Sequence, residues 1–335
     1  MKTLVGFGNP LLDTIVNLNN NDLLDKYGLE ADGQKEVDEV VMQSIFNDIS
    51  SLDKTQTAGG CCQNTLRVLQ WLLNKEKCTS FVYGGVGDDI NAKILENLLN
   101  QDGVKTRYTI MTKFATGCTI ALVNGTNRSL VANLGAAENY TLKNIQSTDY
   151  KENILKSDFV YIEGFFLTKR NDVANCIFNY CICQNKSLIF NLSGEYLVNS
   201  ETDIVLHFAK KADILFGNRR EYNALCKHLK CNDVNSLLKI LKEDRKNKIV
   251  VVTDGSEVIT CYHSNSRVEC IPAQQLNASE IVDTTGAGDS FVAGFIAGLI
   301  LEKSPIDCCK LGSQAASCII KEMGCTFPKV KPDFL

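Results

Sequence analysis

The stretch Asp283-Thr284-Thr285-Gly286-Ala287-Gly288-Asp289 constrains the fold of this 335-residue chain more than any other. Residues 280–282 before it have the pattern of a strand end, and the uncharged run 290–301 has that of a buried helix. Glycines at a helix start let an anion approach the backbone N–H groups and the positive pole of the helix dipole. The motif therefore indicates a phosphate site, with Asp289 beside it to accept a proton from an attacking hydroxyl.

A Gly-x-Gly-Asp run alone is more often a tight turn in which the aspartate only caps the helix. The full seven-residue motif between a strand and a small-residue helix is far more specific, and it favours phosphoryl transfer from a nucleotide to an alcohol. The positive pole of the helix is expected to lower the pKa of Asp289. A weak base suffices, because the alcohol loses its proton late in a loose transition state.

Apolar strand-like and helix-like segments alternate along the second half of the chain, as they do in mostly parallel sheets covered on both faces. The sequence predicts strands at 159–162, 188–192, 214–216, 249–253 and 258–262, and helices at 171–183, 219–229, 234–243 and 306–322. Ligands bind beside the carboxyl ends of such strands. The polar residues that follow these strands, among them Asn191, Asn218, Glu221 and Asp254, are therefore expected near the site.

A hairpin is predicted where Asn124-Gly125 separates two β-rich runs, 118–123 and 129–133. Inserted among alternating strands and helices, it suggests a small lid. Arg128 at the start of the second run is either a solvated residue or a phosphate clamp. Gly59 and Gly60 precede an amphipathic helix, and Asn64 in its first turn either faces a ligand or lies on a solvated face.

Composition excludes several classes of protein. A net charge of -4 without a basic cluster argues against nucleic acid or an anionic membrane as partner, and the longest apolar run, 291–301, is too short to span a bilayer. No Gly-Lys dipeptide of a P-loop is present. The 15 cysteines form no C-x-x-C pair and follow no secretory signal, so reduced thiols in a cytoplasmic protein are expected, with a nuclear location also open.

The motif at 283–289 resembles the second signature of the ribokinase (PfkB) carbohydrate kinase family. The resemblance extends over nearly the whole chain, through matching segments at 6–13, 58–64, 127–134, 164–168, 191–193, 218–221 and 324–334. Within the family it is closest to the members that phosphorylate adenosine. It implies a single ribokinase-like α/β domain over 1–335: a monomeric three-layer sandwich with a mostly parallel central sheet and a small β-rich lid formed by about 14–38 and 113–134.

The same resemblance implies ATP-dependent phosphorylation of the 5′-hydroxyl of adenosine to AMP, with Mg²⁺ as cofactor. Asp289 would be the general base, Arg128 would reach the transferring phosphate, and the anion hole would be Gly286, Ala287 and Gly288. The residues around the nucleoside would be Asn9, Leu11, Asp13, Gly59, Gly60, Cys61, Asn64, Leu130, Ala132 and Phe166, with Asp13 on the ribose and Phe166, rather than its neighbour Phe165, stacked on adenine. The ATP side would comprise Asn191, Asn218, Glu221, Thr253 and Gly255, with Asn218 and Glu221 ordering Mg²⁺ mostly through water.

The chain departs from the family pattern at Cys61-Cys62, where a Ser-Thr-like pair is usual, at Thr285, where asparagine is common, and at Gly194-Glu195, where Ala-Pro is usual. These changes concern base selectivity and contacts on the ATP side. Two alternatives stay open: a kinase that acts on another nucleoside or on a sugar, and a non-catalytic nucleoside-binding protein that keeps the fold.

Overall fold

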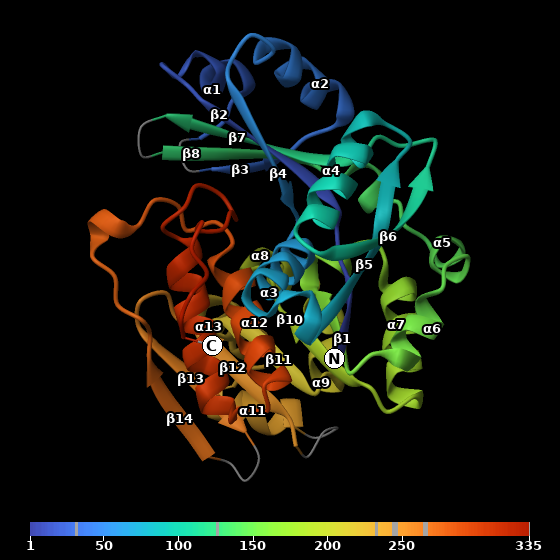
Figure 1. Cartoon of the computed structure of the whole chain (residues 1–335), viewed down its shortest axis with the longest axis vertical. Helices are drawn as coiled ribbons and strands as arrows, with labels where there is room; N and C mark the ends of the chain where they lie inside the picture. The colour runs from blue at the N-terminus through green and yellow to red at the C-terminus, as the bar shows by residue number, and fades with distance from the viewer. Residues whose placement is uncertain (31–32, 125–126, 232–233, 243–246, 264–266, 335) are drawn as a thin grey trace.

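The computed structural model describes residues 1–30, 33–124, 127–231, 234–242, 247–263 and 267–334, which form two sheets and their covering helices (Figure 1). The central sheet has nine strands, in the order β14 (Arg267–Pro272), β13 (Val258–His263), β12 (Ile249–Thr253), β11 (Ile214–Asn218), β10 (Ser187–Asn191), β9 (Phe159–Glu163), β1 (Lys2–Phe7), β5 (Cys78–Gly87) and β6 (Val104–Met111). All neighbours pair in parallel except β12–β13 and β13–β14, which are antiparallel. The mostly parallel central sheet predicted from the sequence is confirmed.

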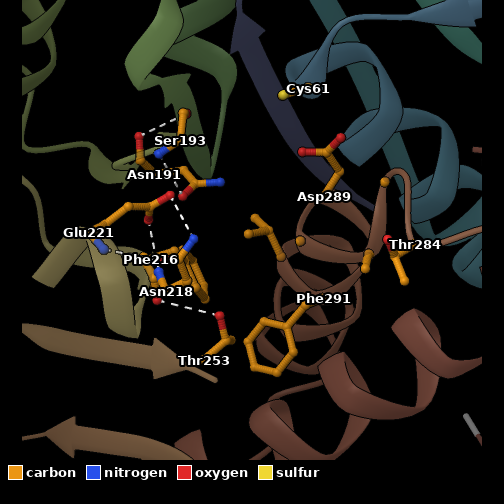
Figure 2. A pocket seen from close by; sticks show the side chains of 15 residues that line it. Cys61, Asn191, Ser193, Phe216, Asn218, Glu221, Thr253, Thr284, Asp289 and Phe291 are labelled. Atoms are coloured by element: carbon orange, nitrogen blue, oxygen red, sulfur yellow. Dashed lines mark hydrogen bonds between the residues drawn. The ribbon is translucent and has the colours of Figure 1, made fainter. Parts of the chain in front are cut away.

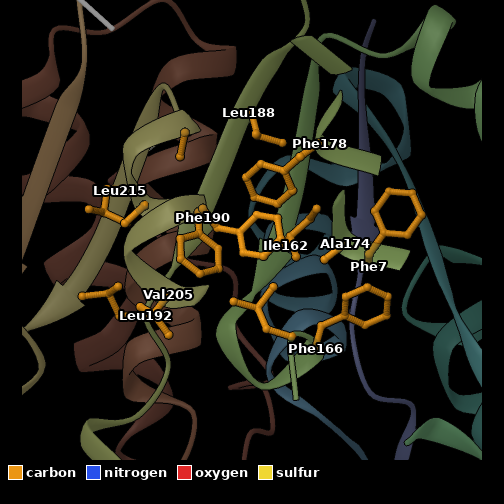
Figure 3. Packing of buried hydrophobic residues seen from close by; sticks show 14 of the residues in the cluster. Phe7, Ile162, Phe166, Ala174, Phe178, Leu188, Phe190, Leu192, Val205 and Leu215 are labelled. Atoms are coloured by element: carbon orange, nitrogen blue, oxygen red, sulfur yellow. The ribbon is translucent and has the colours of Figure 1, made fainter. Parts of the chain in front are cut away.

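Helices cover both faces of the central sheet. Successive side chains of a strand point to opposite faces, and in the buried strands the side chains on both faces are apolar. In β1, Val5 and Phe7 face one core while Leu4 faces the other. The first core lies under α5 (Leu142–Gln146), α6 (Tyr150–Lys156), α7 (Asn171–Cys183), α8 (Glu195–Ser200), α9 (Thr202–Lys211), α10 (Arg219–His228) and α11 (Val234–Lys242), and Figure 3 shows part of it. The second lies under α3 (Cys61–Lys77), α4 (Ile90–Gln101), α12 (Ala287–Ile300) and α13 (Pro305–Ile319).

Helix α12 is apolar on all sides because it is enclosed on all sides. It packs between α3 and α13 on the central sheet. A side chain at Gly298 would meet the Cys308 sulfur at 2.7 Å, so glycine is what lets α13 approach. None of the described helices is both long and apolar enough to cross a membrane.

A second sheet of five strands lies beyond the carboxyl ends of the parallel strands of the central sheet (Figure 1). Its order is β3 (Gln34–Glu36), β8 (Asn127–Asn133), β7 (Gly117–Asn124), β2 (Leu11–Asn17) and β4 (Lys54–Gly59). Helices α1 (Asp22–Tyr27) and α2 (Glu39–Asp48) cover its outer face, where Leu24 and Ile45 pack on Ile120 and Val131. Strands β7 and β8 pair in antiparallel fashion, as a hairpin requires, while the predicted tip at 125–126 lies outside the described residues.

The predicted strand end at 280–282 is wrong. Residues Ala278–Glu280 form a single 3₁₀ turn, and the chain then runs irregularly into the motif, with the Val282 and Asp283 N–H groups both donating to the Ile320 carbonyl at 2.9 and 3.2 Å. The backbone of this segment thus pairs with the residue that ends α13 and not with β14, the edge strand of the central sheet. The side chains of Ile281 and Val282 are exposed, whereas those of a strand inside the sheet would be buried.

Candidate active site

A pocket of about 230 Å³ lies where β10, β11 and β12 end and α12 begins. Figure 2 shows Asp289 and Cys61 on one side of it and Asn191, Asn218 and Glu221 on the other. The residues that line it are Cys61, Asn191, Ser193, Phe216, Gly217, Asn218, Glu221, Thr253, Thr284, Gly286, Ala287, Gly288, Asp289, Phe291 and Val292. The structure thus brings together the predicted base, the three anion-hole residues and every predicted ATP-side residue except Gly255, which lies in the turn after β12.

The glycine turn has the shape that an anion site needs. Gly286 caps α12 in the left-handed region at φ 76°, and a side chain there would meet the Cys325 Cβ at 2.8 Å. At Gly288 a side chain would meet nothing within 4 Å, so this part of the turn is open toward the pocket. Of the three predicted anion-hole residues, Ala287 has an N–H that already donates to a protein group, the Thr284 carbonyl, at 3.2 Å.

Asp289 is 7% exposed, at the first turn of α12. The Asn64 Nδ2 donates to its Oδ2 at 3.0 Å. Burial raises the pKa of Asp289 to about 6; hydrogen bonds from Asn64 and Cys61 lower it, and the charge of Asp13 raises it further. The predicted depression of this pKa is therefore wrong, because burial is the largest influence on it.

Asp13 stands on the inner face of the second sheet, in register with Thr57 of β4 and Thr119 of β7. The Thr119 hydroxyl donates to its Oδ1 at 2.6 Å, and burial raises the pKa of Asp13. A side chain at Gly59 would meet the Asp13 Oδ1 at 2.0 Å, so glycine is needed beside this carboxylate. Thr119 is a site residue that the sequence analysis missed, since strand register decides its place.

Five further predicted residues of the nucleoside site lie in the same region. Leu11 is buried on β2, Leu130 and Ala132 are half-buried on one face of β8, Gly60 turns the chain into α3 at φ 85°, and Asn9 is buried between β1 and β2. The Asn9 Nδ2 donates to the Phe165 carbonyl at 3.3 Å, while its Oδ1 has no hydrogen-bond partner among the described residues. That buried acceptor is available to a ligand.

The prediction that Phe166 stacks on adenine is wrong. Its side chain is 0% exposed and packs in the core against Phe7 and Tyr140, with ring centroids 6.4 and 6.3 Å away (Figure 3). Phe165 is half-buried instead and stacks on Tyr196 at 5.8 Å. Both phenylalanines lie in the 3₁₀ turn Gly164–Phe166, where successive side chains point about 120° apart, so only one of them can face the site.

Arg128 reaches from β8 to the motif loop. Its guanidinium forms an ion pair with the Asp283 carboxylate and donates to the Thr285 hydroxyl. The Asp283 carboxylate also accepts the Thr285 and Gly324 N–H groups at 2.9 and 2.8 Å. Arg128 therefore lies beside the 283–289 motif although it does not line the pocket.

Asn218 and Glu221 cap the start of α10 reciprocally. The Asn218 Oδ1 accepts the Glu221 N–H at 2.9 Å, and the Glu221 Oε2 accepts the Asn218 N–H at 2.8 Å. Burial raises the pKa of Glu221 to about 7. Carboxylate and amide oxygens suit Mg²⁺, which keeps most of its waters. No cluster of three ligating side chains occurs within the described ranges, so these residues fit an ion held mainly by water and phosphate.

Comparisons with known proteins agree with this geometry. The family model described as pfkB family carbohydrate kinase matches residues 38–332. The chain is 30% identical to adenosine kinase 2 of Arabidopsis thaliana, over 99% of this chain and 97% of that protein, and 31% identical to the adenosine kinase of Saccharomyces cerevisiae, over 98% and 97%.

Among solved structures, Anopheles gambiae adenosine kinase in complex with P1,P4-di(adenosine-5) tetraphosphate superimposes with a TM-score of 0.86 at 33% identity, covering 98% of both chains. Schistosoma mansoni adenosine kinase in complex with adenosine gives a TM-score of 0.85 at 29% identity, covering 97% of both. Similarity thus extends over nearly the full length of each of these proteins. The chain belongs to the pfkB family of carbohydrate kinases.

Proposed function

We propose that this chain is an ATP-dependent adenosine kinase, which transfers the terminal phosphoryl group of ATP to the adenosine 5′-hydroxyl and releases AMP and ADP. The observation that carries the proposal is the position of Asp289. It lies in the wall of the pocket at the start of α12, and Asn64, from the α3 end that adjoins the second sheet, is bonded to its carboxylate. A carboxylate at that junction can contact the hydroxyl group that accepts the phosphoryl group on one side and the phosphate of the nucleotide on the other.

In the proposed mechanism the acceptor lies against the second sheet. The Asp13 carboxylate accepts hydrogen bonds from the ribose 2′- and 3′-hydroxyls, and the half-buried Phe165 offers an aromatic face to the base. The buried Asn9 Oδ1 is available to a donor of the nucleoside. These contacts place the 5′-hydroxyl near Asp289, which accepts its proton as the bond to phosphorus forms.

ATP lies on the other side of Asp289, along the residues that line the pocket. The turn at 286–288, which is open at Gly288, receives the transferred phosphoryl group, and Asn191 and Thr253 border the nucleotide. Asn218 and Glu221 would hold Mg²⁺, which neutralises the charge of the phosphates when it is bound. Arg128, now bound to Asp283, is close enough to the loop to exchange that carboxylate for a phosphate.

The second sheet is proposed to act as the lid, with the segments at about 14–38 and 113–134 moving over the bound nucleoside. Strands β2, β3, β7 and β8 fall within or overlap those segments, and β4 adds a strand that the sequence analysis did not foresee. A lid that closes over the site excludes water, which would otherwise compete with the nucleoside for the phosphoryl group.

The proposal is tested by coupled ADP release with ATP and a panel of adenosine, inosine, guanosine, ribose and fructose. We expect kcat/KM for adenosine to exceed that for each other acceptor at least about tenfold, since a base-specific polar site discriminates by more than 1.4 kcal/mol. Equal use of ribose would exclude the nucleoside assignment. Adenosine binding without AMP formation would point to a non-catalytic binding protein.

The pH dependence follows from the raised pKa of Asp289. Only the ionised carboxylate can accept the proton, so log kcat/KM should fall below pH of about 6 and be level above it. In Asn64→Ala the hydrogen bond that lowers this pKa is lost, so the acid limb should move to higher pH. Profiles between pH 4.5 and 8 measure both. Profiles that stay level down to pH of about 4.5 in both enzymes would contradict the assignment.

A further inference from the structure

Glu163, the last residue of β9, is a carboxylate that the proposed mechanism does not use, although it is only 1% exposed. Its Oε1 accepts the Asn9 N–H at 2.8 Å, and its Oε2 accepts the Cys62 N–H at 2.8 Å. These two partners are 154 and 101 residues away in the chain. One side chain therefore joins three segments that are remote in sequence.

Both partners lie where the chain passes between the two sheets. Asn9 belongs to the connection from β1 of the central sheet to β2 of the second sheet, and Cys62 opens α3 just after β4 of the second sheet. The packing between them is tight, because a side chain at Gly8 would meet the Cys62 Cβ at 2.3 Å and the Glu163 Oε1 at 2.7 Å. Glu163 thus holds both connections against the carboxyl end of β9.

These connections carry residues of the proposed nucleoside site. Asn9 presents a buried Oδ1 without a partner among the described residues, and its Nδ2 is bonded to the Phe165 carbonyl. The first turn of α3 carries Asn64, which is bonded to Asp289. A shift of the first connection would displace Asn9 from the nucleoside, and a shift of the second would displace Asn64 from the Asp289 carboxylate. A displacement of about 1 Å of such a group is enough to weaken a site strongly.

We propose that Glu163 is a positioning residue for the nucleoside site: its two hydrogen bonds hold Asn9 and the start of α3 in the geometry that binds adenosine. This inference rests on the proposed function. Both carboxylate oxygens accept an N–H, which is the pattern of an ionised carboxylate. Burial nevertheless raises the pKa of Glu163 to about 7, and the hydrogen bonds from the Asn9 and Cys62 N–H groups lower it only in part. A glutamine of the same shape can satisfy only one of the two N–H groups and turns its own NH₂ toward the other.

The test compares Glu163→Gln with wild-type enzyme by steady-state kinetics and adenosine calorimetry. We expect the KM and Kd for adenosine to rise about tenfold, as the loss of one hydrogen bond to a charged group implies. The KM for ATP should stay within about twofold, since Asn191, Asn218 and Thr253 are untouched. Glu163→Asp keeps the charge, but its side chain is one methylene too short to reach both N–H groups. It should therefore also raise the KM and Kd for adenosine without changing the KM for ATP.

Asp158→Asn is the matched control. The Asp158 Oδ2 accepts the Thr3 N–H at 2.8 Å, which joins β1 to the segment before β9 at the opposite end of the same strands. Its kinetic constants should equal those of the wild type. An unchanged adenosine Kd in Glu163→Gln, or an equal loss for adenosine and ATP together with a lower Tm, would overturn the positioning role. Wild-type enzyme that binds adenosine without forming AMP would overturn the proposed function alone, because calorimetry still decides the role of Glu163.

Discussion

Asp289→Asn should lower kcat for AMP formation by a factor of about 10² to 10⁴, the usual contribution of a positioned general base. The amide has the shape of the carboxylate and can still accept the Asn64 hydrogen bond through its oxygen, so the pocket keeps its form. It cannot take the 5′-hydroxyl proton at any accessible pH. The Kd for adenosine, measured by calorimetry, should stay within about threefold, because the ribose and base contacts remain.

The matched control for this variant is Asp254→Asn. Asp254 also follows a strand near the pocket, but it lies in an exposed turn, forms an ion pair with Arg219 at 3.5 Å and does not line the cavity. Exposed pairs of this kind contribute little to stability, so kcat should be unchanged. Turnover of Asp289→Asn within tenfold of the wild type would remove Asp289 as the base and leave catalysis to positioning and charge neutralisation.

The architecture could be predicted from the sequence wherever a local pattern determines it. The five predicted strands and four predicted helices of the second half all occur within three residues of their expected ends, because the buried strands of the sheet are short apolar runs and the helices between them are amphipathic. The stretch at 280–282 misled because a glutamate followed by two apolar residues is too short a pattern to determine a strand, and the Val282 N–H bonds to the Ile320 carbonyl rather than to the sheet. Strands β3 and β4 are short and mainly polar, so periodicity did not indicate them.

The parts of the site that could not be predicted depend on three-dimensional placement. The choice between Phe165 and Phe166 is made by the phase of one 3₁₀ turn, and the pairing of Thr119 with Asp13 by the register of β2 on β7. The pKa of Asp289 depends on how deeply it is buried, where local sequence shows only the helix pole. Glu163 had no signal at all, because its partners are backbone N–H groups remote in the chain.

Asp13→Ala should raise the KM for adenosine by about 10² or more, while kcat falls much less. The carboxylate is proposed to accept both ribose hydroxyls, and two hydrogen bonds to a charged group are worth about 3 kcal/mol together even at the low end of the usual range. Loss of the Asp13 charge also removes a repulsion that raises the pKa of Asp289. The acid limb of kcat should therefore move to lower pH, opposite in direction to the shift expected for Asn64→Ala.

Gly59→Ala tests the same contact without removing the charge. Its added methyl group would fall 2.0 Å from the Asp13 Oδ1, so the carboxylate must turn away from the ribose. We expect a similar rise in the KM for adenosine, but the acid limb of kcat should stay near the wild-type position because the charge remains close to Asp289. Kinetics across the pH range for the two variants separate position from charge. If both variants kept the wild-type KM for adenosine, the nucleoside would have to bind away from the second sheet, and Asp289 would no longer lie between the two substrates.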